Sequence, residues 1–87
     1  MTWKIEISEQ ARKQVKKLSK ADAERVTRSL QEIALLEDPR QRGHGLVGDY
    51  AGYWRYRVGD YRIIAKIEDA RLVIVVIAIG HRREIYR

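Results

Sequence analysis

The chain has 87 residues, and 18 lysines and arginines against 12 aspartates and glutamates give it a formal net charge of +6. This length suits one domain, residues 1–87, with a modest core, and the charge favours an anionic partner, either nucleic acid or an acidic protein. The absence of cysteine excludes disulfides, thiolate catalysis and cysteine-based zinc sites. No basic segment followed by an apolar run marks a secretory signal, and the longest apolar run, residues 72–79, is too short for a membrane span. We therefore expect a cytoplasmic protein without membrane contact.

The first part of the chain predicts a strand followed by two helices. Apolar and charged residues alternate over residues 2–7, which is typical of a strand. Ser8 is a favourable N-cap for a first helix, because apolar residues follow it at helical spacing. A second helix is expected from about residue 21 to residue 37, and Asp38-Pro39 ends it because the residue before a proline disfavours the helical region.

Residues 40–52 form a glycine-rich segment that we expect to be a loop. No Lys-Ser or Lys-Thr pair follows these glycines and no strand precedes them, so the segment is not a nucleotide-binding P-loop. His44 stands alone in this loop, and the sequence gives it no partner for chemistry.

Residues 53–64 predict a β-hairpin, because large apolar and cationic side chains alternate on both sides of a two-residue Gly59-Asp60 turn. This turn places Arg57 opposite Arg62. The face that carries the cations holds Tyr53, Arg55, Arg57, Arg62, Ile64 and Lys66. The other face is apolar and is expected to belong to the core; it holds Trp54, Tyr56, Val58, Tyr61, Ile63, Ala65 and Ile67.

The cationic face of the hairpin has two possible explanations. Like charges directly opposite each other on a hairpin are unfavourable by a few tenths to ~1 kcal/mol, so a sheet has no structural need for the pair Arg57 and Arg62. The face is either a phosphate-binding site, because guanidinium groups bind phosphate oxygens in a fixed bidentate geometry, or an ordinary solvated strand face whose charges are screened.

Residues 72–79 predict an inner strand, because they are apolar on both faces. A turn at Asp69-Ala70 would place Arg62 opposite Ile77. Two helices can cover one face of this sheet, so the apolar residues on its other face mark either a partner site or the place where the long loop folds over. These elements together predict an α+β protein, in which two N-terminal helices pack on a small antiparallel sheet in the order strand, helix, helix, strand, strand, strand.

The last residues, 80–87, could join the hairpin cations in one site, because they follow the strand that ends beside Arg62. Cleavage of RNA through its own 2′-hydroxyl needs a base, an acid and cations for the developing phosphorane charge, but neither a metal nor a protein nucleophile. Tyr86 and His81 are alternative bases, and no His/carboxylate cluster has metal-ligand spacing. We expect no cofactor.

Two segments closely resemble the RelE toxins of the RelE/ParE superfamily: Tyr-Arg-Val-Gly-Asp-Tyr-Arg-Ile-Ile (56–64) and Val-Ile-Ala-Ile-Gly-His-Arg-Arg-Glu-Ile-Tyr (76–86). The order of the elements and the loop residues Leu46 and Gly48 agree with the same family. The resemblance implies a toxin of a type II toxin–antitoxin system, a ribosome-dependent endoribonuclease that cuts mRNA in the A site. It also implies an acidic RelB-like antitoxin, with operator DNA contacted only through the antitoxin complex.

The resemblance also implies roles for individual residues of the site. Arg62 and Arg82 match the pair that binds the phosphate and stabilises the transition state, with Arg82 also a candidate proton donor, and Tyr86 matches a tyrosine that helps to activate the 2′-hydroxyl. Arg55 and Arg57 stand where some relatives have lysines. A lysine with a lowered pKa can be unprotonated near neutral pH and an arginine cannot, so these two residues can bind RNA and stabilise charge but not act as bases. The full predicted set is Arg62, Arg82, Tyr86 and His81 for catalysis and Arg55, Arg57 and Arg83 for binding RNA.

Two other functions stay open at this stage. A ParE-like inhibitor of DNA gyrase has the same fold, although such proteins typically lack the arginine and tyrosine set. A non-catalytic basic module would use the same arginines only to hold nucleic acid or an acidic partner.

Overall fold

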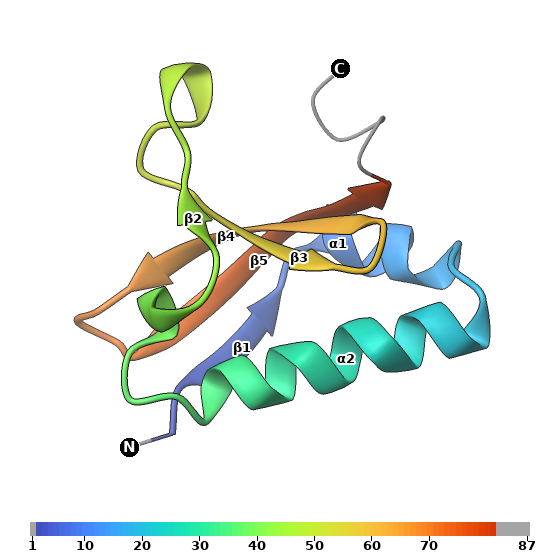
Figure 1. The fold of residues 1–87 in the computed structure, drawn as a ribbon, viewed down its shortest axis with the longest axis horizontal. Coiled ribbons are helices and arrows are strands. Elements are labelled where there is room, and N and C mark those ends of the chain that lie inside the picture. The colour runs from blue at the N-terminus through green and yellow to red at the C-terminus, as the bar shows by residue number, and fades with distance from the viewer. Residues whose placement is uncertain (1, 82–87) are drawn as a thin grey trace.

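The computed structural model describes residues 2–81, in which two helices pack against one face of a five-stranded sheet (Figure 1). The elements are β1 (Lys4–Ile7), α1 (Glu9–Lys16), α2 (Lys20–Ala34), β2 (His44–Gly45), β3 (Trp54–Val58), β4 (Tyr61–Glu68) and β5 (Val73–His81), with 3-10 turns at Pro39–Gln41 and Gly48–Tyr50. The α+β class is confirmed, as is the order of one strand, two helices and a final three-strand meander.

The sheet is mixed, which corrects the expectation of a wholly antiparallel sheet. Its strand order is β1-β5-β4-β3-β2, and β1 runs parallel to β5 while the other neighbours are antiparallel. The meander leaves one edge of β5 open, and β1 fills it, so the most apolar strand has a neighbour on each side. The two helices carry the chain across the sheet between β1 and the meander, and alternation within β1 cannot reveal the direction in which such a distant strand pairs.

Side chains of α1 fix the end of β5. Ser8 is the N-cap of α1, where its hydroxyl accepts a hydrogen bond from the Ala11 N–H at 3.1 Å and donates to the Ile77 carbonyl at 3.0 Å. One turn further, the Gln14 side-chain oxygen accepts from the Ile79 N–H at 2.6 Å. The last part of β5 is therefore held by a helix on the opposite side of the sheet from the cations.

The core lies between the two helices and the sheet. Its buried residues come from the position just before β1, from both helices and from the three long strands: Trp3, Ala11, Val26, Leu30, Ile33, Ala34, Tyr56, Ile63, Ala65, Ile74, Val76 and Ile79. The other face of the sheet is partly closed, because Ile64 and Val73 are also buried there while Val75 and Ile77 are half-buried.

The hairpin of β3 and β4 has the predicted register, with Arg57 opposite Arg62 and Val58 opposite Tyr61. The register of β4 and β5 is different from the expected one, because Arg62 lies opposite Gly80 rather than Ile77. Two causes add up: the turn spans residues 69–72 instead of two residues, and a bulge shifts the pairing between Ile64 and Ala65. Leu72 takes a left-handed conformation in that turn (φ 53°), which a side chain of its type does not signal in a sequence.

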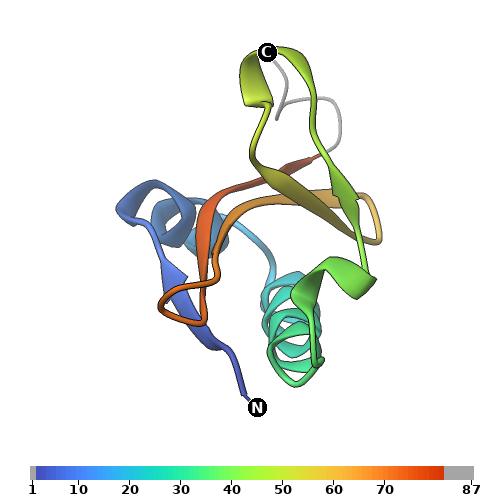
Figure 2. The ribbon, with the colours of Figure 1, turned by 90° about the vertical axis from the view of Figure 1, so that its left-hand side faces the viewer.

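The segment expected to be a loop contains a short strand. His44 and Gly45 form β2, the edge strand beside β3, and residues 46–53 then project from the sheet on the side away from α2 (Figures 1 and 2, yellow-green). No helix within residues 2–81 is both long enough and apolar enough to span a membrane.

Candidate functional site

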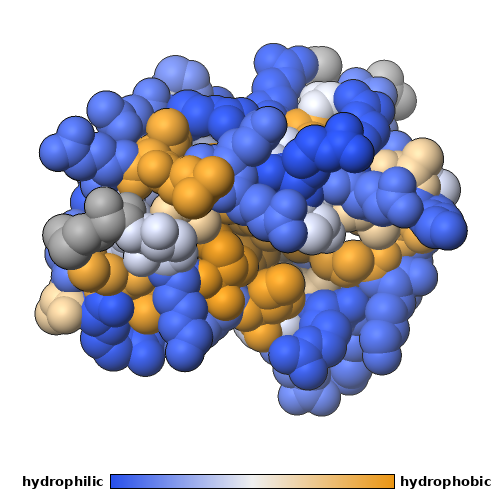
Figure 3. Space-filling view, turned by 90° about the horizontal axis from the view of Figure 1, so that it is seen from below, coloured by the Kyte–Doolittle hydropathy of each residue, from blue (hydrophilic) through white to orange (hydrophobic). Residues whose placement is uncertain are grey.

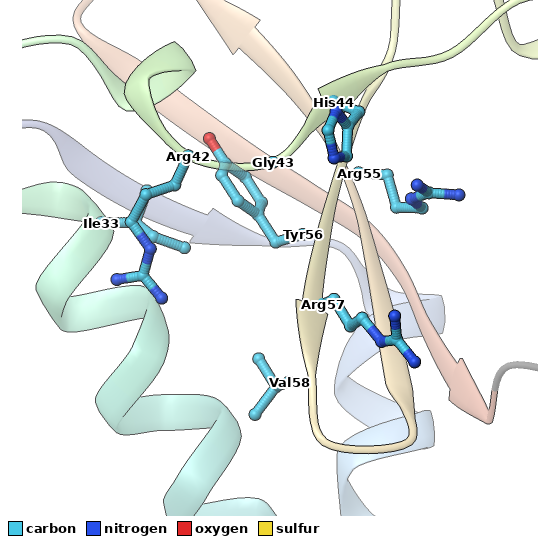
Figure 4. A pocket seen from close by; sticks show the side chains of 8 residues that line it. All are labelled: Ile33, Arg42, Gly43, His44, Arg55, Tyr56, Arg57 and Val58. Carbon is cyan, nitrogen blue, oxygen red and sulfur yellow. The ribbon is translucent and has the colours of Figure 1, made fainter.

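Three arginines of the hairpin share one face of the sheet. Tyr56 and Ile63 belong to the core, so the residues of opposite parity on β3 and β4 point away from the helices. Figure 4 shows Arg55 and Arg57 on the same side of β3, opposite to Tyr56 and Val58. Since Arg62 is the cross-strand partner of Arg57, the structure brings the predicted catalytic Arg62 together with the predicted RNA-binding Arg55 and Arg57.

Arg62 is the least solvated of these arginines. Its Nε and Nη1 atoms are buried, whereas Arg57 is exposed. A guanidinium keeps its charge when it is buried, unlike a lysine ammonium. Its attraction to an anion is also stronger where water is excluded, so Arg62 is the best placed of the three to stabilise charge that develops on a bound group.

The edge strand β2 adds a histidine to this face. His44 lies directly opposite Arg55, and the glycine on either side of it packs tightly against β3. A Cβ on Gly43, which has φ +79°, would lie 2.3 Å from the Arg55 carbonyl oxygen. Trp54 Nε1 also donates to the Arg42 carbonyl at 2.7 Å, which holds the start of β2 against the same strand.

A cavity of about 200 Å³ lies at this edge of the sheet (Figure 4). It is lined by Ile33, Arg42, Gly43, His44, Arg55, Tyr56, Arg57 and Val58. Tyr56 donates its hydroxyl to the Pro39 carbonyl at 2.7 Å, and burial raises the pKa of Tyr56 to about 12. Tyr56 is therefore a structural residue that stays protonated near neutral pH, and the other polar side chains that line the cavity are Arg42, His44, Arg55 and Arg57.

His81 lies on the opposite face of the sheet from these cations. It is the cross-strand partner of Tyr61, and the two rings meet edge to face with their centroids 6.0 Å apart. The Tyr61 hydroxyl donates to Asp22 of α2 at 3.0 Å. A second cavity of about 400 Å³, lined by Gln14, Lys17, Leu18, Tyr61, Ile79, Gly80 and His81, lies on this helix-covered side.

The other predicted site residues, Arg82, Arg83 and Tyr86, lie outside the described residues. Their roles stay predictions from the sequence. What the structure adds is the position where their segment begins: β5 ends at His81, one residue after the pair of Arg62 and Gly80. Within residues 2–81 no cluster of three or more histidine, aspartate or glutamate side chains could hold a metal ion.

Comparison with known proteins places the chain in a family. Residues 5–86 match the model of the ParE toxin of type II toxin–antitoxin systems, parDE. The chain belongs to this family. It is 29% identical to Toxin RelG of Mycobacterium tuberculosis over 90 residues, which cover 100% of this chain and 99% of RelG.

Solved structures of RelE toxins have the same fold. The isolated RelE toxin of E. coli is 27% identical, with a TM-score of 0.75 over 97% of this chain and 90% of that one. RelE in the archaeal RelE–RelB complex from Pyrococcus horikoshii is 26% identical, with a TM-score of 0.74 over 97% and 99% of the two chains. The protein is thus a type II toxin of the RelE/ParE family, and the resemblance stated from the sequence is confirmed.

The sequence did not reveal the part of the site built by β2. His44 and Arg42 lie in the segment expected to be a loop, yet they line the same cavity as Arg55 and Arg57. The Gly-His-Gly triplet is the feature that could have indicated it, because two residues without a Cβ on either side of one polar residue suit a close approach between strands.

Proposed function

We propose that this toxin is an endoribonuclease that cuts mRNA in the ribosomal A site, without a metal, and so inhibits translation. The observation that carries the proposal is the pair Arg57 and Arg62, which face each other across the hairpin on the side of the sheet without helices. A toxin whose only role is to bind a protein has no need of two opposed guanidinium groups, one of them with buried nitrogens.

The RNA supplies the nucleophile, its 2′-hydroxyl, so the protein has three tasks. Arg57 and Arg62 bind the scissile phosphate, and Arg62 stabilises the negative charge that grows as the 2′-oxygen attacks phosphorus. Arg82 stabilises the same charge and donates a proton to the leaving 5′-oxygen. Tyr86 takes the proton from the 2′-hydroxyl, the role that its match to the tyrosine of the family implies.

Geometry favours Tyr86 over His81 as the base. His81 packs edge to face on Tyr61 on the helix-covered side, away from the face that carries Arg57 and Arg62. The arginines at positions 55 and 57 cannot replace it, because a base must be unprotonated before the reaction and an arginine is fully protonated near neutral pH. Arg55 and Arg83 then serve to bind the RNA backbone.

The proposed partners are the ribosome, mRNA and an acidic RelB-like antitoxin, all in the cytoplasm. Solved structures of related toxins are RelE–RelB complexes, from Pyrococcus horikoshii and from Methanococcus jannaschii among others. Figure 3 shows apolar side chains gathered in a band between hydrophilic areas on the side where α2 lies, which is the kind of surface that a protein partner covers. Contact with operator DNA would occur only through the antitoxin.

The experiment is cleavage of a programmed mRNA on purified ribosomes, with the cut mapped by primer extension. Wild-type toxin should cut in the A site, and Arg62→Ala should lower the rate about 10²–10³-fold, as expected when a group that stabilises the transition state is removed. Ribosome affinity should change far less than the rate. Arg28→Ala, an exposed arginine of α2, is the matched control and should cut at the wild-type rate.

Two results would contradict the enzyme. If a folded wild-type toxin leaves the mRNA intact with and without ribosomes, the endoribonuclease proposal is wrong. If Arg62→Ala lowers affinity and rate by the same factor, the arginines only bind, as in a non-catalytic module.

Inhibition of DNA gyrase is the second candidate, because the family model that matches is described by the parDE toxin. A gyrase supercoiling assay with the same wild-type protein tests it. Inhibition there, together with intact mRNA on ribosomes, would replace the first proposal.

A further inference from the structure

We propose that His44 and Arg55 form a second phosphate position, which binds the backbone phosphate next to the one held by Arg57 and Arg62. This inference rests on the proposed endoribonuclease function and extends its site beyond the hairpin, to the edge strand β2. It assigns a role to His44, the residue for which the sequence gave none.

The two positions repeat the same arrangement. His44 lies directly opposite Arg55, and Arg57 lies directly opposite Arg62. All four residues share the face of the sheet without helices, and two residues along β3 separate the pairs by roughly 6–7 Å. The histidine and the three arginines therefore cross the face as a diagonal line from β2 to β4, as a single nucleic-acid strand would require.

The backbone of β2 packs closely against β3 on both sides of His44. Gly43 approaches β3 so closely that a Cβ would lie 2.3 Å from the Arg55 carbonyl oxygen, and a Cβ on Gly45 would lie 3.2 Å from the Trp54 ring. His44 is the one residue of the triplet with a side chain, and it is exposed. The imidazole ring of His44 on β2 thus stands beside the guanidinium of Arg55 on β3.

The surroundings favour an anion of some size. The cavity beside this pair has a volume of about 200 Å³, and no acidic side chain is among the described residues that line it. Arg42 also lines the cavity and forms a 3.5 Å ion pair with Glu32, and both side chains of this pair are exposed to solvent. Exposed ion pairs of this kind contribute little, so Glu32 does not neutralise the site.

An RNA phosphate is the occupant that fits best, because His44 and Arg55 stand beside Arg57 and Arg62 on the same face of the sheet. Phosphate contacts of this kind set the register of a strand on a protein and carry no base information. His44 is therefore a positioning residue, which aligns the scissile linkage over Arg62 rather than acting on the reacting atoms.

The test scans the phosphates of the mRNA one at a time. Each mRNA carries a neutral methylphosphonate at one non-scissile linkage near the A-site codon, with a 2′-O-methyl group on the nucleotide before it. The reference mRNA carries the 2′-O-methyl group alone. Cleavage on programmed ribosomes is measured for wild type, His44→Ala, His44→Lys and the control Arg28→Ala.

One linkage next to the scissile one should slow wild-type cleavage about tenfold when it is neutral, the size expected for one hydrogen bond to a charged group. His44→Ala should cut the reference mRNA about tenfold more slowly and show little further loss at that linkage. His44→Lys and Arg28→Ala should keep the wild-type sensitivity. A protein that was merely damaged by the substitution would instead lose rate equally at all linkages.

The failures are distinguishable. If wild type does not cut even the reference mRNA, the proposed function fails. If wild type cuts, but each neutral linkage slows wild type and His44→Ala by the same factor, the function stands and the second phosphate position is wrong. Thermal unfolding of the variants checks that they fold; should His44→Ala not fold, His44→Gln takes its place under the same criteria.

Discussion

The two faces of the β3–β4 hairpin have opposite tasks. On one face Tyr56, Ile63 and Ala65 are at most 2% exposed and pack in the core. On the other, alternate residues of the same two strands present Arg55, Arg57 and Arg62. The apolar face fixes the register of the two strands, because a slip by one residue would exchange the two faces. The cations can then oppose each other although nothing in the folding of the sheet favours it.

The energies support this division. Full burial of one isoleucine side chain stabilises a protein by about 1.5–3 kcal/mol, whereas two like charges across a hairpin cost at most ~1 kcal/mol. The core residues of the hairpin therefore outweigh the repulsion between Arg57 and Arg62. Substitutions on one face should affect stability, and substitutions on the other face should affect the rate of cleavage.

The largest expected effect is on the core face. Ile63→Ala should lower the free energy of unfolding by about 2–5 kcal/mol, because Ile63 is 0% exposed and the smaller side chain leaves a cavity. Urea unfolding followed by circular dichroism measures it. Ile7→Ala is the control: Ile7 is 38% exposed, so its loss should be clearly smaller. The rate of cleavage per folded molecule should not change for either variant; a lower rate for folded Ile63→Ala would mean that the two faces are not independent.

The next effect is on the cationic face. Arg57→Ala should slow A-site cleavage about 10–100-fold, because a charge-assisted hydrogen bond to the phosphate is lost. The same change removes the repulsion with Arg62, so the free energy of unfolding should stay equal or rise by up to ~1 kcal/mol. Cleavage on ribosomes and urea unfolding give the two values. If Arg57→Ala lowers the free energy of unfolding by more than ~1 kcal/mol, Arg57 stabilises the fold, and the cationic face is not separate from folding stability.

The hairpin itself could be predicted from the sequence, because both of its determinants are local. Residues 53–64 alternate strictly, and a Gly-Asp pair interrupts them where the turn lies. Ser8 likewise marks the start of α1, since its side chain accepts a hydrogen bond from the N–H three residues on. The faces of β3 and the pairing of Arg57 with Arg62 follow from these features alone.

The remaining features of the site depend on contacts between distant residues. The bulge near Ile64 and the left-handed Leu72 change the register of β5 by three residues, and neither has a sequence signature. The strand β2 is two residues long and exists because Gly43 allows the backbone to pack against Arg55. The placement of His81 on the helix-covered face follows from that corrected register, which the sequence did not provide.

A smaller effect concerns Tyr56, which joins the core face to the edge of the cavity. Tyr56→Phe should lower the free energy of unfolding by about 1–3 kcal/mol, because the buried Pro39 carbonyl loses its 2.7 Å hydrogen bond. Burial also raises the pKa of Tyr56 from 10.0 to about 12. Between these pH values the unfolded chain ionises while the folded protein stays protonated, so wild-type stability should fall as the pH rises through this window.

That part of the alkaline loss should be absent from Tyr56→Phe and present in the control Tyr53→Phe. Urea unfolding at a series of pH values from 9 to 12 measures it. If Tyr56→Phe loses stability with pH as steeply as wild type does, Tyr56 ionises equally in both states and its hydroxyl is not held as described.

The smallest effect contrasts the cationic face with an arginine whose partner lies in the same chain. Arg40 donates two hydrogen bonds to Asp69, at 2.9 and 2.8 Å, and joins the segment after α2 to the β4–β5 turn. These hydrogen bonds hold the pKa of Asp69 below its ordinary value. A carboxylate with a lowered pKa stabilises the folded state above its unfolded pKa, near ~3.9, and this contribution is lost as the pH falls through the folded pKa.

Asp69→Asn should therefore reduce stability slightly at neutral pH and weaken the fall in stability below about pH 4. Thermal unfolding from neutral to acid pH measures it, with Asp49→Asn in the projecting segment as the matched loss of one carboxylate. Cleavage should stay at the wild-type rate in both variants, because Arg40 is neutralised within the chain and binds no RNA. Arg40 supports the fold through its ion pair with Asp69, whereas the opposed Arg57 and Arg62 are proposed to bind the phosphate; slower cleavage by Asp69→Asn would show that these two roles are not separate.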